Sequence, residues 1–205
     1  MTTLLVIAKE PRPGRVKTRL TPPFSPEQAA GLAEAALADT LRAVAAAPAD
    51  RRVLMLEGRP GPWLPDGFEV VPQCPGGLDE RLADAFARCA GPTLLVGMDT
   101  PQITPDLLST DFTDCDARFG PADDGGFWAL GLARPEPGLL RGVPMSVPET
   151  GTVQRERLAA AGLRVHDLPR LRDVDTAADA HAVAALAPDT AFAARLAALT
   201  HPGAS

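Results

Sequence analysis

The sequence predicts a three-layer α/β/α fold with a mostly parallel central sheet, and two observations support this prediction. Short apolar runs alternate with helical segments along the 205 residues, as is typical of a sheet that helices cover on both faces. The runs at residues 3–8 and 92–97 are continuously apolar, as expected for strands buried on both faces. One domain suits this length, and we expect it to span residues 1–200, followed by a frayed tail at 201–205.

The first half of the chain is expected to hold four strands and two long helices. Ser25 is a suitable N-cap, Pro26 suits the first helical position, and Gln28 can bond back as in a capping box. The second helix is amphipathic and Gly91 ends it. The run at 92–97 is the most apolar, so we expect it to be central. The predicted strands are 3–8, 52–57, 68–72 and 92–97, and the predicted helices are 26–47 and 78–90.

The second half is expected to begin with a short helix capped by Thr104. Asp123-Asp-Gly-Gly126 then separates two strand-like runs, which is a hairpin signal. Gly162 ends a later helix, and Thr176-Ala-Ala-Asp179 is a second capping-box pattern that opens the terminal helices. The predicted strands are 115–121, 127–132 and 164–168, and the predicted helix is 153–161.

Charge and cysteine content exclude several function classes. The net charge of −6 and the pI near 5.1 argue against a general binder of nucleic acids or membrane surfaces. Three widely spaced cysteines form no CxxC pair, so neither a disulfide framework nor a zinc site is indicated. The apolar run at 4–8 is too short for a signal peptide or a membrane span. We therefore expect a cytoplasmic protein.

The first loop, residues 9–20, is the most informative segment. It contains both lysines of the chain and three arginines against one acid, Glu10. Because these five cations repel one another, an anionic partner such as a di- or triphosphate is the simplest reason to concentrate them. Gly14 would let backbone N–H groups approach an oxyanion. The alternative is a solvated basic surface loop. The cations are Lys9, Arg12, Arg15, Lys17 and Arg19.

Three acidic segments lie where a ligand could be held. Asp99 follows the most apolar strand and could hold Mg²⁺ against phosphates, or it could cap the turn into Thr100-Pro101. The glycines of the segment 123–126 permit close approach to a sugar or base, but a plain hairpin turn explains them too. The spacing of Asp173 and Asp175 puts both carboxylates on one side of an extended segment. They could form a second metal contact, or they could be a charge pair at a helix N-terminus.

Other motifs are excluded. The segment around Lys17 lacks the glycines of a P-loop, and no GxGxxG follows a strand. The three histidines are scattered, and none has an acid and a nucleophile nearby to suggest a catalytic triad.

Four motifs together resemble a bacterial family of GT-A-fold proteins described as glycosyltransferase-like or nucleotide-diphospho-sugar transferases. These proteins are similar to the guanylyltransferases of molybdenum-cofactor and 2-phospholactate biosynthesis. The match runs in order from residue 4 to about residue 186. The motifs are Ala8-Lys9-x-Pro-x-Pro-Gly14-x-Val-Lys17-Thr-Arg19-Leu20, Gly97-x-Asp99-x-Pro101, Gly120-Pro-Ala-x-Asp124-Gly-Gly-Phe127-x-x-Leu-Gly131-Leu and Asp173-Val-Asp175-Thr.

The resemblance implies roles for individual residues. The phosphates of a nucleotide would be held by Lys9, Gly14, Arg15, Lys17 and Arg19. The base would meet Gln73, Gly76 and Gly77. The metal, Mg²⁺ or Mn²⁺, would be held by Asp99 with Asp173 or Asp175. The acceptor or sugar pocket would be bordered by Asp124, Gly125 and Gly126. The candidate catalytic residues are Lys17, Asp99 and Asp124.

The resemblance implies a metal-dependent transferase that uses a nucleoside triphosphate or a nucleotide-diphosphate sugar and a small-molecule acceptor. Nucleotidyl and glycosyl transfer use the same donor cradle, so both remain open. Gly97 stands where a glycosyltransferase D-x-D motif has its first acid, which favours the nucleotidyltransferase-like arrangement. Met145-Ser146 stands where relatives often have Trp-Ser. The alternative from another class is a catalytically silent nucleotide-binding or regulatory module.

Overall fold

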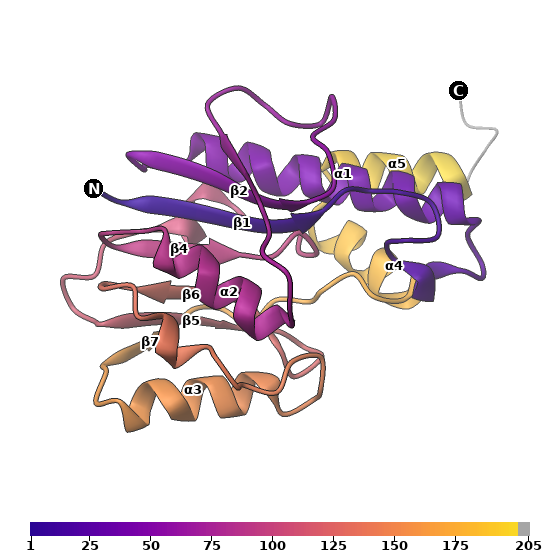
Figure 1. Ribbon diagram of the computed structural model, residues 1–205. Helices are drawn as coiled ribbons and strands as arrows, with labels where there is room; N and C mark the ends of the chain where they lie inside the picture. Colours follow the sequence, from indigo (N-terminus) through magenta and orange to yellow (C-terminus); the bar gives the residue numbers. More distant parts are fainter. Residues whose placement is uncertain (201–205) are drawn as a thin grey trace.

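The computed structural model describes residues 1–200, and the predicted tail at 201–205 lies outside the described residues (Figure 1). A seven-stranded sheet forms its centre. Each predicted strand is present, with ends that shift by at most two residues. The strands are β1 (Thr3–Lys9), β2 (Arg51–Glu57), β3 (Glu69–Pro72), β4 (Thr93–Val96), β5 (Ala117–Pro121), β6 (Phe127–Leu132) and β7 (Val165–Asp167).

The strands lie in the order β3-β2-β1-β4-β6-β5-β7. All neighbours pair in parallel except β6, which runs antiparallel to both β4 and β5. The predicted mostly parallel sheet is therefore confirmed, and so is the predicted hairpin of β5 and β6. Strand β4 is fourth of the seven and all four of its residues are buried, as its apolar composition predicted.

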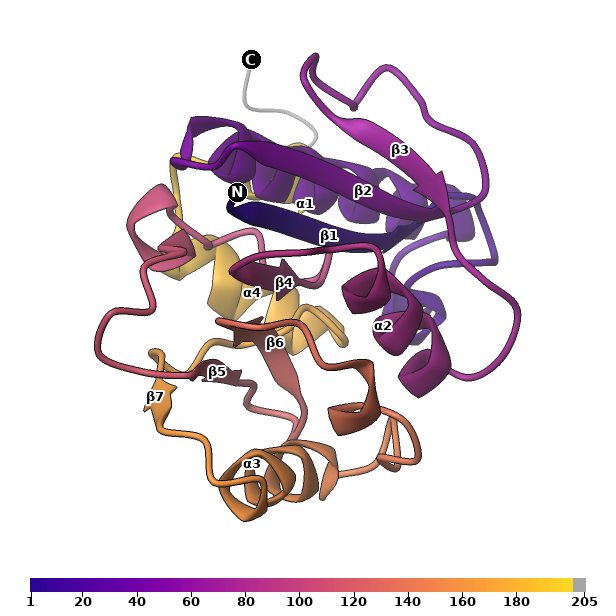
Figure 2. The ribbon, with the colours of Figure 1, turned by 60° about the vertical axis from the view of Figure 1, so that its left-hand side comes forward.

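Helices cover both faces of the sheet (Figures 1 and 2). α1 packs on one face, α5 lies against α1, and α4 lies against α5. α2 and α3 cover the other face. The α-helices are α1 (Pro26–Ala46), α2 (Leu78–Ala87), α3 (Thr150–Ala160), α4 (Ala177–Leu186) and α5 (Ala191–Thr200), and the 3₁₀ helices are η1 (Thr18–Leu20), η2 (Pro105–Leu108) and η3 (Pro137–Leu139).

The predicted helix starts are correct where a side chain caps them. The Ser25 hydroxyl accepts from the N–H of Gln28, and the Gln28 amide oxygen accepts from the N–H of Ser25. Thr176 and Asp179 form the second predicted capping box. In contrast, α2 ends before the predicted residue 90, because the N–H groups of Arg88 and Cys89 bond three residues back and close the helix in a tighter turn.

The sheet brings distant segments to one edge. The parallel strands β1 to β5 end there, and antiparallel β6 starts there. The basic loop, the segment after β4, the β5–β6 turn and the segment after β7 therefore all begin at the same edge, where open α/β sheets bind ligands. No helix within residues 1–200 has the length and apolarity that a membrane crossing requires.

Candidate functional site

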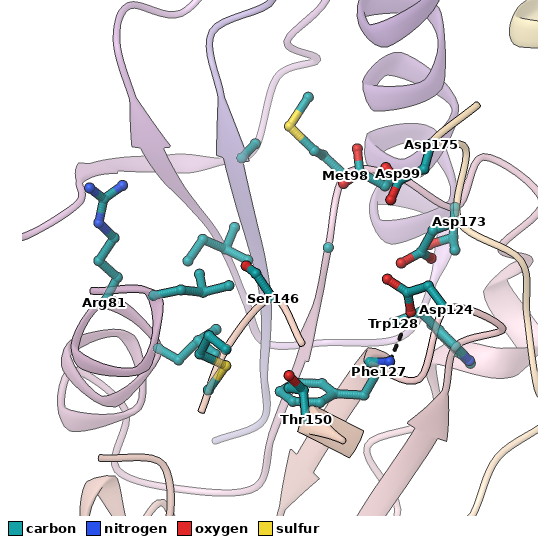
Figure 3. A pocket seen from close by; sticks show the side chains of 18 of the residues that line it. Arg81, Met98, Asp99, Asp124, Phe127, Trp128, Ser146, Thr150, Asp173 and Asp175 are labelled. Carbon is teal, nitrogen blue, oxygen red and sulfur yellow. Dashed lines mark hydrogen bonds between the residues drawn. The ribbon is translucent and has the colours of Figure 1, made fainter. Parts of the chain in front are cut away.

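A cleft of about 770 Å³ opens at the carboxyl edge of the sheet. Its walls come from the ends of β1 and β4, the start of α2, the β5–β6 turn, the loop before α3 and the segment after β7. Figure 3 shows Asp99, Asp124, Asp173 and Asp175 on one side of this cleft, with Arg81 on the opposite side. The cleft thus has an acidic side and, across from it, a wall built on α2.

Lys17 lies against two of the four acids, Asp99 and Asp175. Its ammonium is 2.7 Å from Asp99 Oδ1 and 3.2 Å from Asp175 Oδ1, and only 8% of its side chain is exposed. The backbone of Lys17 is left-handed, with φ of 48°, which few residues other than glycine adopt. Burial alone would lower the pKa of Lys17, but the charges of Asp99 and Asp175 outweigh burial and raise this pKa above its ordinary value.

Three further cations of the first loop also have carboxylate neighbours. Arg19 Nη1 is 3.2 Å from Asp175 Oδ2, and Lys9 Nζ is 3.7 Å from Glu57 Oε2. Arg12 lies 3.8 Å from Glu10. Four of the loop's five cations therefore have carboxylate partners within the protein, so their mutual repulsion does not by itself require an anionic ligand.

Arg15 differs from its neighbours because its side chain makes no ion pair within residues 1–200. It lines a second, smaller hollow of about 240 Å³ beside the cleft. Lys9, Lys17 and Arg19 line the same hollow, together with Asp99 and Asp175. Gly14 has a φ of +72° in the exposed bend before Arg15 and lines neither hollow. The structure thus brings the four predicted phosphate-binding cations around one space.

Asp173 is the most perturbed acid of the site. Burial raises its pKa to about 8, with further contributions from the charges of Asp99 and Asp124. Its Oδ1 atom is buried without a hydrogen-bond partner, and so is the hydroxyl of Thr100, which also lines the cleft. Buried oxygens without partners are uncommon in folded proteins, so these two are candidate ligand contacts.

These residues fit a hard divalent cation, which prefers carboxylate and other oxygen ligands. Within residues 1–200, however, no group of three or more His, Cys, Asp or Glu side chains is arranged to hold a metal ion. The ammonium of Lys17 lies against Asp99 and Asp175 instead. The predicted ligands Asp99, Asp173 and Asp175 line one cleft, and a metal there would have to share or displace the lysine.

The residues predicted to meet a base lie in the segment between β3 and α2. Gln73 and Gly76 line the cleft, whereas Gly77 does not and instead precedes the first residue of α2. The Gln73 amide donates to the carbonyls of Ala8 and Met55, at 2.7 and 3.0 Å. Its NH₂ group therefore fixes the strand ends, and its oxygen accepts from Arg81.

The β5–β6 turn docks tightly on the chain before α3. Gly125 has a φ of +89°, and a Cβ atom there would come within 2.0 Å of the carbonyl oxygen of Pro148. The N–H of Gly151 donates to the carbonyl of Gly125 at 2.8 Å. Asp124 and Gly126 line the cleft, with the Asp124 carboxylate accepting from the N–H of Gly126. The glycines therefore serve the docking of two segments as well as the hairpin turn.

Sequence reasoning assigned no role to two side chains in the cleft walls. Arg81 bonds to Glu57 and to the carbonyl of Gly76, and its position on the polar face of an amphipathic helix was the available signal. Ser146 has a φ of 60° and its hydroxyl makes no hydrogen bond within residues 1–200. No sequence pattern indicated that strained conformation.

Comparisons with known proteins agree with this geometry. A solved structure from Desulfovibrio desulfuricans G20, described as a "putative nucleotide-diphospho-sugar transferase", is 26% identical, with a TM-score of 0.84 over 97% of this chain and 94% of that one. The cytidylyltransferase for 2-C-methyl-D-erythritol 4-phosphate from Thermus thermophilus is 16% identical, with a TM-score of 0.55 over 92% and 100%. Rv0371c from Mycobacterium tuberculosis H37Rv, in complex with manganese, is 22% identical, with a TM-score of 0.52 over 89% and 96%.

A comparison with curated proteins gave no match. The predicted resemblance and the predicted fold class are confirmed by the structural comparisons, which relate the chain by its fold to the "putative nucleotide-diphospho-sugar transferase" and to the cytidylyltransferase named above. The family model matches more than half of the sequence, including most of α1, β2 and the cleft residues from Gln73 to Val147. The chain belongs to the family described as "Uncharacterized protein conserved in bacteria (DUF2064)", whose model matches residues 31–147.

Proposed function

We propose that this protein is a divalent-metal-dependent transferase that takes a nucleoside triphosphate or a nucleotide-diphosphate sugar as donor. The observation that carries the proposal is the convergence of Lys17, Asp99 and Asp175 at the carboxyl edge of the sheet. Cations that bind phosphate and carboxylates that bind metal are both needed to hold a metal–polyphosphate complex. The fold relatives named above support the same reading.

The donor's phosphates would lie against the basic loop and its base beside the start of α2. Arg15 and Arg19 are exposed beside the smaller hollow and would stabilise negative charge that develops on the leaving phosphates. The acceptor, beside Asp124 and Gly126, would attack the donor directly, so the protein needs no nucleophile of its own. When bound by Asp99 with Asp173 or Asp175, a divalent cation would neutralise phosphate charge and fix the donor's orientation.

Lys17 would exchange partners when the donor binds. Its ammonium otherwise lies against Asp99 and Asp175 and offsets part of their negative charge. Donor phosphates would attract the ammonium, and the two carboxylates would then be free for the metal. Metal and donor should therefore bind cooperatively. The donor draws Lys17 away from the two carboxylates, and the metal takes the place of Lys17 on them.

The experiment is a thermal-shift panel of nucleoside triphosphates and nucleotide-diphosphate sugars, each with and without Mg²⁺ or Mn²⁺. At a free donor concentration of 100 times Kd, binding stabilises the folded state by about 2.7 kcal/mol. We expect one donor class to shift the melting temperature more with metal than without it. Asp99→Asn should abolish the gain from metal, whereas Asp106→Asn, at an exposed acid outside both hollows, should keep it.

The donor class that gives the shift distinguishes nucleotidyl from glycosyl transfer. A donor that binds equally well with and without metal, in wild type and in Asp99→Asn, would favour the alternative of a catalytically silent nucleotide-binding module. No shift with any donor would reject the proposal. We place the protein in the cytoplasm, which its three free thiols support.

A further inference from the structure

Within residues 1–200, the wall of the cleft away from the first loop has no lysine or arginine. The proposed donor would leave this wall open. Its lining within the described residues comes from the β5–β6 turn, the first residues of β6, the loop before α3 and Asp173. None of these residues is lysine or arginine, and Asp124 and Asp173 are acids. The nearby arginines are engaged elsewhere, since Arg170 donates to the carbonyl of Ala122 and Arg172 pairs with Asp123.

The same side has a fixed apolar wall. Phe127, Met145 and Val147 contribute side chains to it. The ring of Phe127 lies 5.7 Å from the ring of Phe119 at an interplanar angle of 49°, a favourable aromatic arrangement that holds it in place. Val147 is 39% exposed and is one of few large apolar side chains in residues 1–200 that lie so open. Apolar surface left open in a cleft is typical of a ligand site.

One hydroxyl group on this wall is free to bind a ligand. Thr150 uses its hydroxyl to close the loop, donating to the carbonyl of Pro144 and accepting from the N–H of Val147. Ser146, between two apolar wall residues, has an exposed hydroxyl without a partner in the described structure. Its backbone is left-handed, with φ of 60°, and belongs to the loop that Thr150 closes.

We propose that this wall binds an uncharged acceptor that has an apolar face and hydroxyl groups. The inference rests on the proposed function, because it assumes that donor phosphates occupy the smaller hollow, which the cations of the first loop line. A phosphorylated or carboxylated acceptor would face Asp124 and the donor's own phosphates, and no lysine or arginine of this wall would offset the repulsion. Like charges without a counter-ion are a strong means of excluding a ligand. An apolar face would bury Phe127, Met145 and Val147, and a hydroxyl group would meet Ser146.

The test uses two probes that share one aromatic ring and differ in charge. 4-Nitrophenyl β-D-glucopyranoside is uncharged, and 4-nitrophenyl phosphate is an anion at neutral pH. Saturation-transfer NMR measures the binding of each probe, with inorganic pyrophosphate present to fill the smaller hollow beside the first loop. We expect the glucoside to bind at least about tenfold more tightly than the phosphate.

Val147→Arg provides the decisive variant, because it adds a cation to the wall at an exposed position. It should move the preference toward the phosphate probe by at least about fivefold. Val70→Arg is the matched control, since Val70 on edge strand β3 is 38% exposed and lines neither hollow. It should leave the probe preference as in wild type.

Three results would overturn the inference: equal or tighter binding of the phosphate probe to wild type, the same effect from both arginine variants, or no binding of either probe. The assay contains no nucleotide, so its outcome is separate from that of the donor panel. If donors fail to bind while the glucoside is preferred, the transferase proposal fails and the uncharged-ligand site stands. If donors bind and the phosphate probe is preferred, only the acceptor inference fails.

Discussion

Lys17 shows how one residue can serve two opposed needs of the site. Asp99 and Asp175 are close enough to share its ammonium, and without a cation they would repel each other and the other acids of the cleft. A lysine is suited to this position because its ammonium is a compact point charge on a flexible stem. The side chain can therefore stabilise the empty site and still turn toward a phosphate.

Lys17→Met should separate these two effects. Donor affinity should fall by about 1–3 kcal/mol, the range for a hydrogen bond to a charged group. Binding of Mn²⁺ without nucleotide should become at least about threefold tighter, because the competing ammonium is gone. Calorimetric titration with each ligand measures both effects.

The control for this prediction is Arg12→Met, which removes the same charge from the same loop. Arg12 is exposed, lies 3.8 Å from Glu10 and lines neither hollow. Its replacement should change neither affinity appreciably. Weaker Mn²⁺ binding in Lys17→Met would contradict the exchange of partners, because it would make the lysine a support of the metal site.

At the scale of elements, the docking of the β5–β6 turn against the loop before α3 builds the acceptor wall. Gly125→Ala should destabilise the protein, because the added Cβ would lie 2.0 Å from the carbonyl oxygen of Pro148. Gly67 is a matched control with φ of +87°, where an added Cβ would have no atom within 4 Å. Gly67→Ala should cost about 1 kcal/mol, the cost of the left-handed backbone alone.

Gly125→Ala should cost about 1–3 kcal/mol more than Gly67→Ala, as expected for a clash with rigid backbone. Urea unfolding of both variants measures the difference. Equal costs would show that the turn and the loop move apart freely, and the wall would then not be a fixed surface.

The pairing of β5 with edge strand β7 gives a prediction about pH. The Asp116 carboxylate accepts hydrogen bonds from the side chain and the N–H of Arg164, and these lower the pKa of Asp116 to about 2. Because the folded pKa lies below the unfolded value, this stabilisation is present above about pH 4 and is lost as pH falls through about 2. Urea midpoints for wild type and Asp116→Asn should therefore differ at about pH 5 and converge near about pH 2.

Asp66→Asn is the control for that series, since Asp66 is exposed and makes no ion pair within residues 1–200. Its midpoint should follow wild type at both pH values. A gap between wild type and Asp116→Asn that stays constant down to about pH 2 would show that the Arg164 contact does not depend on the charge of Asp116.

The sequence predicted elements better than contacts, and the reason is physical. Strand and helix identities follow from local patterns, such as the apolar run of β4 and the Ser25 capping box. The convergence of the basic loop with Asp99 also followed, because parallel strands end at one edge. The pairing of Lys17 with Asp175 spans 158 residues, and no local pattern carries such information. For the same reason, the tight approach of Gly125 to Pro148 could not be predicted.

At the scale of the whole molecule, the cleft and the packing of α5 against α1 depend on different contacts. Asp39 in α1 accepts from the N–H groups of Ala191 and Phe192 at 3.0 and 2.8 Å, and so caps the start of α5. Its side chain is only 5% exposed, and Arg42 lies 2.7 Å from it. This acid is 152 residues away in sequence from the helix it caps. It links α1 to α5 on the face of the sheet that α1 covers.

Asp39→Ala should therefore lower the free energy of unfolding by about 2–4 kcal/mol, because it removes a helix cap and leaves two buried donors without an acceptor. Asp39→Asn keeps the side-chain oxygen for one N–H group and should cost less.

Donor affinity at about 25 °C should stay as in wild type in both variants, because Asp39 lines neither hollow. Urea unfolding and donor titration measure the two quantities. A loss of donor affinity that parallels the loss of stability would show that the cleft depends on the packing of α5 against α1, and that the two regions form one cooperative unit.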